Sequence, residues 1–321
     1  MGGSGPTGVK GTPPRYCAEA EVLRPSAAMP DTNPLARPLA HWFARHARDL
    51  PWRAADRTPW QVMVSEYMLQ QTPVDRVLPA WQAWMDRWPT PADCAAAPAD
   101  QPVRMWGRLG YPRRARRLHE AARLIVTDFG GEVPADRASL LSLPGIGDYT
   151  AAAIQSFAFG TRSIVLDTNI RRVIARVVTG QALPLPHVTA AERMLAEDLT
   201  PRSAKASATW NAAIMELGAL ICTARAPKCE QCPLADQCRW LADDRPEYTG
   251  TVRRQAKFEG SDRQARGAIM NVLRHASASV PQSAIEAAWS DELQRKRALA
   301  SLIADGMVEQ LPRKRYGLPA Q

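Results

Sequence analysis

Residues 143–150 read Leu-Pro-Gly-Ile-Gly-Asp-Tyr-Thr and lie between two segments with helical spacing of apolar residues. Glycine adopts backbone conformations closed to other residues, so Gly145 and Gly147 permit a tight hairpin between two helices. Such a hairpin bares successive backbone N–H groups at the start of the next helix, where the helix dipole favours an anion such as a phosphate. A Gly-x-Gly pair alone most often marks a turn, so the surrounding sequence has to decide.

The chain around this hairpin has a helical pattern from residue 33 to about residue 242. Residues 60–71 and 74–84 place apolar residues at spacings of three and four. Short breaks that contain Pro or Gly separate the helices, and runs of β-branched residues alternating with polar ones are scarce. We therefore predict an all-α domain over residues 33–242.

Three further segments flank or follow this domain. Residues 1–32 are rich in Gly, Pro and Ser and show no periodicity, which predicts a disordered extension. Residues 243–260 are polar, contain Pro and Gly, and are predicted to form a linker. Residues 261–321 predict a small module of three helices and a short basic hairpin, which we interpret as winged-helix-like; the alternative is a helical appendage packed on the main domain. The three helices are expected at about 262–277, 281–288 and 291–304.

Charge and hydropathy narrow the class of protein. The 321 residues carry a formal net charge of +9, and arginine in excess neutralises a polyanion, most commonly nucleic acid. A basic composition alone would give the same charge, but residues 104–117 hold six arginines and no acid, so at least one face is strongly positive. No run approaches the roughly 18 apolar residues of a membrane helix, and no signal-peptide pattern is present. We expect a cytoplasmic, nucleoid-associated protein.

Four of the six cysteines fall within 17 residues, with six, two and five residues between them: Cys222, Cys229, Cys232 and Cys238. In a cytosolic chain such clustering indicates metal rather than disulfides. Structural zinc sites usually contain two short Cys-x-x-Cys pairs, and only one is present here, so a 4Fe–4S cluster fits better than zinc. Because all four ligand positions are filled by protein, we expect the cluster to support folding and DNA contact rather than hydrolysis.

Two acidic residues stand in apolar surroundings. Asp167 follows the apolar segment 163–166, where the simplest role of an Asp is to cap a helix N-terminus. Glu66 lies within the largely apolar segment 62–68, so its carboxyl is expected to be partly desolvated, with a raised pKa. A neutral carboxylic acid can protonate a leaving group, and a carboxylate can stabilise positive charge.

Together these segments resemble the MutY family of adenine DNA glycosylases, within the helix–hairpin–helix and endonuclease III superfamily. The resemblance spans roughly residues 34–240 and is carried by the hairpin, by Val-Leu-Asp-Thr-Asn at 165–169, by Ser-Glu-Tyr-Met-Leu-Gln-Gln-Thr at 65–72 and by the cysteine spacing. It implies a helix–hairpin–helix glycosylase fold with a 4Fe–4S loop. It also implies a monomer that binds double-stranded DNA and removes adenine mispaired with 8-oxoguanine or guanine. The short chain resembles actinobacterial members.

The resemblance implies catalytic roles residue by residue. Glu66 would protonate N7 of adenine, and Asp167, with Asn169 in the same segment, would stabilise the oxocarbenium-like sugar. Tyr149 stands where bifunctional relatives carry the Lys that forms a Schiff base, so we expect a monofunctional glycosylase with little or no lyase activity.

Residues implied to bind substrate form two groups. Arg48 and Arg53 would line the adenine pocket, and Glu216 would hydrogen-bond the flipped adenine. The alternatives are that the arginines lie on the surface and that Glu216 pairs with a neighbouring basic side chain. The second group would contact the duplex. Some of its side chains would insert beside the orphaned purine, and the hairpin glycines would contact phosphates. This group comprises Gln71, Thr72, Tyr111, Gly145 and Gly147. The arginines after Tyr111 would then hold phosphates, although Tyr111 could equally fill a core.

The sequence also departs from the family. Thr168 stands where many members have Gly, and Pro73 where a polar residue is common. Only about 60 residues follow the linker, whereas members commonly carry a longer Nudix-like domain that recognises 8-oxoguanine, so discrimination between 8-oxoguanine and guanine stays open. One alternative is a thymine-mismatch or oxidised-pyrimidine glycosylase, against which Glu66 and Tyr149 argue. Another is a non-catalytic iron–sulfur DNA-binding protein, which would not need both carboxylates.

Overall fold

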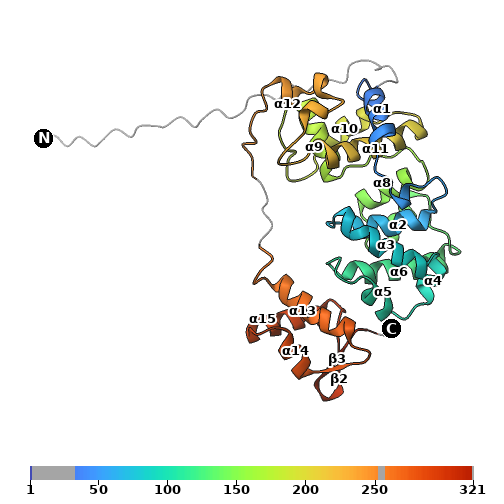
Figure 1. Cartoon of the computed structure of the whole chain (residues 1–321), viewed down its shortest axis with the longest axis vertical. Helices are drawn as coiled ribbons and strands as arrows, with labels where there is room; N and C mark the ends of the chain where they lie inside the picture. The colour runs from blue at the N-terminus through green and yellow to red at the C-terminus, as the bar shows by residue number, and fades with distance from the viewer. Residues whose placement is uncertain (2–32, 252–256, 320–321) are drawn as a thin grey trace.

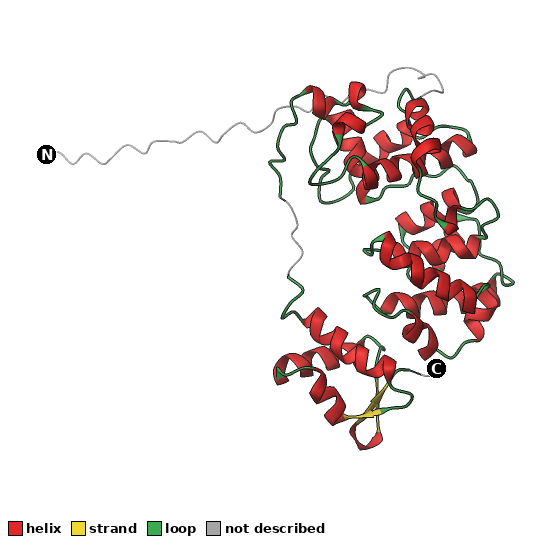
Figure 2. Cartoon of the chain, in the orientation of Figure 1, coloured by secondary structure: helices red, strands yellow, loops and turns green. Residues whose placement is uncertain are grey.

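The computed structural model describes residue 1 and residues 33–251 and 257–319. The predicted disordered extension at residues 1–32 therefore lies outside the described residues apart from residue 1, as does part of the predicted linker at 243–260. Within the described ranges, helices make up the main domain and strands occur in the C-terminal module, which confirms the all-α prediction (Figure 2). No helix in these ranges is long and apolar enough to cross a membrane.

The main domain is a succession of mostly short helices. In chain order they are α1 (Ala36–His46), η1 (Pro51–Arg53), α2 (Pro59–Leu69), α3 (Val74–Arg87), α4 (Pro91–Ala96), α5 (Asp100–Met105), α6 (Arg113–Asp128), α7 (Arg137–Ser142), α8 (Asp148–Phe157), α9 (Thr168–Ile174), the π-turn η2 (Ala175–Thr179), α10 (Ala190–Leu199), α11 (Ala204–Leu220), η3 (Cys229–Gln231), η4 (Ala235–Gln237) and α12 (Arg239–Ala242). Several begin at a Ser, Thr or Asp whose side chain accepts a hydrogen bond from a backbone N–H of the first turn, which is the usual N-cap. Those residues are Thr58, Thr90, Asp136, Asp167, Thr189 and Ser203.

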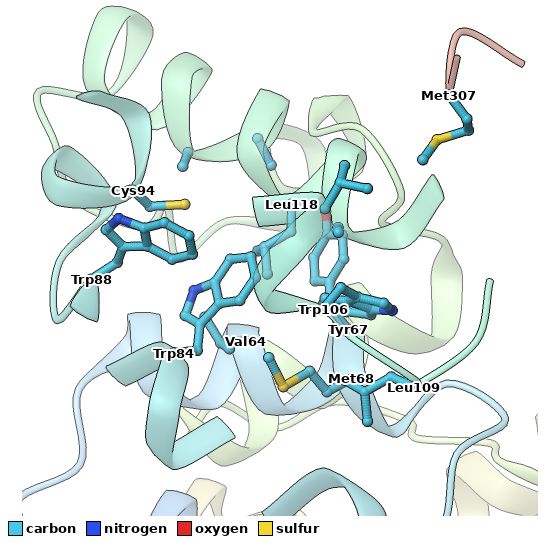
Figure 3. Close-up of a cluster of buried hydrophobic side chains, with 14 of the residues drawn as sticks. Val64, Tyr67, Met68, Trp84, Trp88, Cys94, Trp106, Leu109, Leu118 and Met307 are labelled. Carbon is cyan, nitrogen blue, oxygen red and sulfur yellow. The ribbon is translucent and has the colours of Figure 1, made fainter. Parts of the chain in front are cut away.

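Two hydrophobic cores divide the main domain into two lobes (Figure 1). The first comprises α2 to α7, and its centre is Trp84, whose ring packs edge to face against Trp88 and Trp106 with centroids 4.7 and 5.9 Å away (Figure 3). The second contains α1, α9, α11 and the cysteine loop. Helix α8, which follows the hairpin, contributes Ile154 to the first core and Ala153 to the second, so it joins the two lobes.

The C-terminal module contains three helices and a small antiparallel sheet. Its elements are α13 (Asp262–His275), β1 (Val280–Pro281), α14 (Gln282–Ala288), α15 (Glu292–Ala304), β2 (Glu309–Leu311), η5 (Pro312–Lys314) and β3 (Arg315–Gly317). The strand order is β1-β3-β2, with Tyr316 opposite both Val280 and Gln310. The helices and the hairpin lie where the sequence predicts them, while the winged-helix interpretation stays a prediction.

The module packs directly on the first lobe. Met307 is fully buried and belongs to the same hydrophobic core as Trp106 (Figure 3). The Arg104 guanidinium donates to the carbonyls of Arg274 and Ala276, both over 2.7 Å, and Arg116 donates to the carbonyl of Gly306 over 3.0 Å. Arg113 pairs with Asp305 of the module over 3.1 Å, so three arginines of the basic segment 104–117 hold the module in place.

Candidate active site

Glu66 lies on a helix that is buried on nearly all sides, because eight of the eleven residues of α2 are buried. Glu66 is only 5% exposed. The hydroxyl of Tyr149, on α8, donates a hydrogen bond to Oε2 of Glu66 over 3.1 Å. Burial raises the pKa of Glu66 to about 7; the Tyr149 hydrogen bond opposes this rise, and the charge of Asp167 adds to it. A carboxyl with this pKa is partly protonated near neutral pH, as a general acid must be.

Asp167 caps the N-terminus of α9, as an Asp in its sequence position favours. Its Oδ1 accepts from the backbone N–H of Ile170 over 2.6 Å, and its Oδ2 accepts from Nδ2 of Asn169 over 2.9 Å. Burial raises the pKa of Asp167 above its usual value. The hydrogen bonds and the nearby Arg172 guanidinium oppose this rise but do not cancel it. The structure thus brings Glu66, Tyr149, Asp167 and Asn169 together between the lobes.

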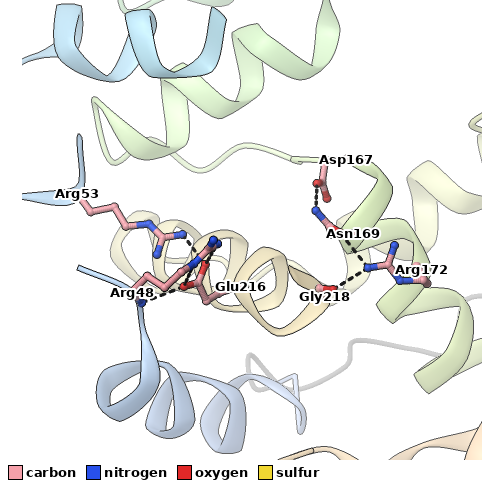
Figure 4. A network of polar contacts seen from close by, with 7 residues as sticks. All are labelled: Arg48, Arg53, Asp167, Asn169, Arg172, Glu216 and Gly218. Carbon is pink, nitrogen blue, oxygen red and sulfur yellow. Dashed lines mark hydrogen bonds and ion pairs between the residues drawn. The ribbon is translucent and has the colours of Figure 1, made fainter. Parts of the chain in front are cut away.

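A buried arginine that the sequence analysis did not single out connects Asp167 with the cysteine loop (Figure 4). Arg172 donates to Oδ1 of Asn169 over 2.9 Å, to the carbonyl of Gly218 over 2.7 Å and to the carbonyl of Cys222 over 2.8 Å. Gly218 allows the close approach of α11, since a Cβ there would stand 2.7 Å from Cβ of Asn169. The sequence signal available was a basic side chain within the apolar segment that follows Asp167.

Glu216 and two arginines form an ion-pair cluster on the other side of the site (Figure 4). Arg48 donates to both carboxylate oxygens of Glu216, over 2.8 Å from Nε and 2.7 Å from Nη2, and Arg53 donates to Oε2 over 3.0 Å. Burial raises the pKa of Glu216, but the hydrogen bonds from Arg48 and Arg53 outweigh burial and lower the pKa to about 2. Arg48, Arg53 and Glu216, which the sequence analysis placed together in the adenine pocket, do lie together. Glu216 is paired with the two arginines, as in the alternative interpretation of a Glu paired with a basic residue.

Arg53 keeps one donor open. Its Nη1 is buried and finds no hydrogen-bond partner within the described part of the chain. Its charge also lowers the pKa of Glu66, so the guanidinium lies near both Glu216 and Glu66. A buried N–H without a partner is unfavourable, and a bound group that accepts a hydrogen bond would relieve it.

The loops of Gln71 and Tyr111 are held together by one buried arginine. Arg114 donates to the carbonyl of Gln70 over 2.6 Å, to the carbonyl of Gly110 over 3.1 Å and to the Thr72 hydroxyl over 2.9 Å. Arg114 is buried and both of its Nη atoms donate inside the protein, so the expectation that it holds phosphates is wrong for this residue. Thr72 is buried and its hydroxyl accepts this hydrogen bond from Arg114, while its contact with substrate stays a prediction.

The hairpin glycines differ in their roles. Gly145 has a φ of +89°, and a Cβ there would stand 2.9 Å from the ring of Tyr67, so only glycine fits. Gly147 has a φ of −110° as the N-cap of α8, so the expectation of a special conformation is wrong for Gly147. Open space surrounds its Cα, however, which leaves the N-terminus of α8 accessible to a ligand.

The four clustered cysteines line one cavity. Cys222 follows the C-terminus of α11, and the cavity walls include Leu217, Trp240 and Arg176. Arg176 is 2% exposed, donates to Sγ of Cys222 over 3.3 Å and lies 4.5 Å from the centroid of the Trp240 ring. Four soft thiolate ligands around one mostly apolar cavity fit an iron–sulfur cluster. Within the described ranges no three potential ligands converge closely enough to hold a single ion, so the shared cavity is the observation that carries this fit.

Comparison with known proteins agrees with this geometry. Residues 64–196 match the family described as HhH-GPD superfamily base excision DNA repair protein, and residues 222–238 match the iron–sulfur binding domain of endonuclease III. The adenine DNA glycosylase of Mycolicibacterium smegmatis is 47% identical over 88% of this chain and 95% of its own. That of Mycobacterium tuberculosis H37Rv is 44% identical over 96% and 99%. Among solved structures, a thermostable thymine-DNA glycosylase is 30% identical with a TM-score of 0.59 over 66% of this chain and 97% of its own.

Proposed function

Since this chain belongs to the adenine DNA glycosylases of the HhH-GPD base excision repair superfamily, we propose that it removes adenine from double-stranded DNA by hydrolysing the N-glycosidic bond. The observation that carries the proposal is the pair of buried carboxyl groups, Glu66 from α2 and Asp167 at the start of α9. They lie close enough for the charge of Asp167 to raise the pKa of Glu66. One acid and one carboxylate are the two groups that cleavage of a glycosidic bond requires.

The two carboxyl groups have complementary roles. Glu66 in its neutral form donates its proton to a ring nitrogen of adenine, N7 by the family resemblance, and the bond between C1′ and the base breaks with its electron pair leaving on the base. The sugar then carries positive charge, which the Asp167 carboxylate stabilises. Water adds to C1′ and gives its proton to the Glu66 carboxylate, which restores the acid and leaves an intact abasic site. Tyr149 offers no amine for a Schiff base, so the enzyme is monofunctional.

Arg53 supplies a direct contact to the flipped base. Its buried Nη1 has no partner in the described part of the chain, and adenine presents ring nitrogens that accept hydrogen bonds. Glu216 and Arg48 hold the guanidinium in position. Glu216 is thus a positioning residue for Arg53, in addition to any contact of its own with the adenine amino group.

The loops outside the pocket fit a duplex. Tyr111 is 43% exposed at the tip of its loop and, with Gln71, serves as a wedge beside the purine opposite the excised adenine, which is 8-oxoguanine or guanine. The N-terminus of α8 behind Gly147 receives a phosphate. One pocket acts on one flipped base, so the enzyme works as a monomer, in the cytoplasm at the nucleoid.

The cysteine loop of this family holds a 4Fe–4S cluster on Cys222, Cys229, Cys232 and Cys238. When bound, the cluster would link the four cysteines and so hold the loop together. It would take no part in hydrolysis. Folding of that loop fixes the Cys222 carbonyl, to which Arg172 donates, and Arg172 in turn holds Asn169 beside Asp167.

The test is a single-turnover assay of adenine release from duplexes with adenine opposite 8-oxoguanine, guanine or thymine. We expect release opposite the first two, loss of release in Glu66→Gln, and no change in Glu132→Gln, which alters an exposed Glu in the connection between α6 and α7. Release of thymine from a mismatch, without release of adenine, would replace this proposal with the thymine glycosylase alternative. Strand nicking without added base or heat would contradict the monofunctional assignment.

A further inference from the structure

A cavity of about 1540 Å³ lies between the C-terminal module and the main domain, away from Glu66 and Asp167. One wall is the α13 helix of the module, and the other consists of the loops of Gln71 and of residues 107–113. We call it the α13 cleft. We propose that the α13 cleft binds the DNA strand opposite the excised adenine, with α13 as the surface that contacts its backbone; this inference rests on the proposed function.

The charge of the α13 cleft suits a polyanion. Six arginines and no Asp or Glu are among its lining residues. Two of the six, Arg113 and Arg266, pair with Asp305, so they contribute less. The other four come from both walls and keep their positive charge, although two of them, Arg76 and Arg274, donate to the backbone carbonyls of Arg108 and Gly107: Arg76, Arg108, Arg263 and Arg274. Arginines on facing walls can contact successive phosphates of one strand, which supplies affinity without sequence preference.

The face of α13 that lines the cleft has an unusual residue at its centre. Gly267 is exposed in the middle of the helix, and a Cβ there would have nothing within 4 Å. Glycine is less favourable than alanine inside a helix, and no atom of residues 33–251 or 257–319 comes close enough to account for the missing side chain. A glycine that borders an open, basic cleft allows another backbone to approach closely.

Neighbouring turns of the same helix carry polar side chains on that face. Arg263 and Asn271 stand four residues before and after Gly267, and residues four apart share one face of a helix. All three line the cleft. The Asn271 side chain is exposed and carries both donors and an acceptor, so it can hydrogen-bond either a phosphate or a base edge.

The opposite wall presents the proposed wedge. Gln71 and Tyr111 have φ values of 56° and 47°, a conformation that residues other than glycine seldom adopt. Arg114 holds both loops from inside the protein. These two loop tips are therefore fixed in place on one wall of the α13 cleft. The nucleotide opposite a flipped adenine would lie beside them.

The experiment measures binding of a fluorescein-labelled duplex, with adenine opposite guanine or 8-oxoguanine, by anisotropy on the full chain. The variants are Gly267→Leu, which fills the close approach, Gly267→Ala and Asn271→Ala. The matched control is Ala300→Leu, which adds the same side chain at an exposed position on α15 that does not line the cleft. Thermal unfolding of each variant reports folding.

We expect Gly267→Leu to weaken binding at least tenfold and Gly267→Ala at least threefold, although Ala favours the helix and keeps or raises the Tm. Asn271→Ala should weaken binding about threefold and Ala300→Leu less than twofold. Gly267 variants that fold and bind as tightly as Ala300→Leu would overturn the inference. Should Gly267→Leu not fold, Gly267→Ala decides alone. Wild-type protein that binds duplex but releases no adenine would refute the proposed function and leave the binding comparison to judge the cleft.

Discussion

Glu66 and Glu216 are both buried glutamates on helices, 5% and 0% exposed, yet their surroundings give them opposite proton affinities. Burial raises the pKa of Glu66 to about 7, and the neutral Tyr149 hydroxyl is the group that donates a hydrogen bond to its carboxyl. Glu216 meets two guanidinium groups, which hold its pKa at about 2. Burial alone therefore does not decide whether a carboxyl is an acid or an anion; the charge of its partner does.

The largest expected effect is on catalysis at Glu66. Glu66→Gln removes the transferable proton but keeps the shape of the side chain, so the single-turnover rate of adenine release should fall by about 10²–10⁴-fold. The free energy of unfolding should not fall, because a neutral amide replaces a carboxyl whose charge is disfavoured by burial. Urea unfolding of the same protein checks this, and a large loss of stability would contradict the comparison.

Glu216→Gln should instead act on stability. Removing the carboxylate leaves Arg48 and Arg53 without their shared partner, and breaking a buried pair costs about 3–5 kcal/mol. Because the two arginine side chains are 33% and 25% exposed, we expect the lower end, about 3 kcal/mol. The measurement is again urea unfolding, with Glu132→Gln as the control. A loss below about 1 kcal/mol, the value of an exposed pair, would mean that solvent compensates the arginines.

The dependence of stability on pH should have opposite signs at the two residues. The pKa of Glu66 rises from 4.5 to about 7, so the folded state binds the proton more tightly and stability falls as pH rises from about 4.5 through 7, by about 3 kcal/mol. The pKa of Glu216 falls from 4.5 to about 2, so its contribution is present above about pH 4.5 and is lost as pH falls toward 2. The difference in the free energy of unfolding between wild type and each Gln variant, measured from about pH 2.5 to 8, isolates the two contributions. If the two differences in free energy of unfolding changed with pH in the same direction, the opposite proton affinities of Glu66 and Glu216 would be contradicted.

The smallest effect should come from Tyr149. Tyr149→Phe removes the hydrogen bond that lowers the pKa of Glu66, worth about 1 kcal/mol, so that pKa should rise further. The activity of a general acid falls as pH rises through its pKa, so this fall should move to higher pH in Tyr149→Phe. The readout is the pH profile of the single-turnover rate at subsaturating enzyme. An unchanged or lowered midpoint would show that Tyr149 does not contact the acid.

Local patterns made most of the fold predictable. Helical spacing, Pro and Gly breaks and N-cap residues depend on neighbours in the chain, so the helices of the main domain and of the module fall where these patterns indicate. The hairpin and the cysteine spacing are local too. The winged-helix interpretation and the residue roles stay predictions.

The sequence by itself thus determined the all-α class, the cysteine cluster and which side chains could carry chemistry, since each depends on residue type and spacing. Only the tertiary structure decided what those side chains meet. Arg114, expected to face DNA with its neighbours, turns inward because the carbonyl of Gln70, 44 residues away in the chain, joins that of nearby Gly110 as an acceptor. Glu66 and Glu216 differ in proton affinity because the groups around each come from segments 80 or more residues away in the chain. Long-range contacts of this kind arise from packing, which no local pattern encodes.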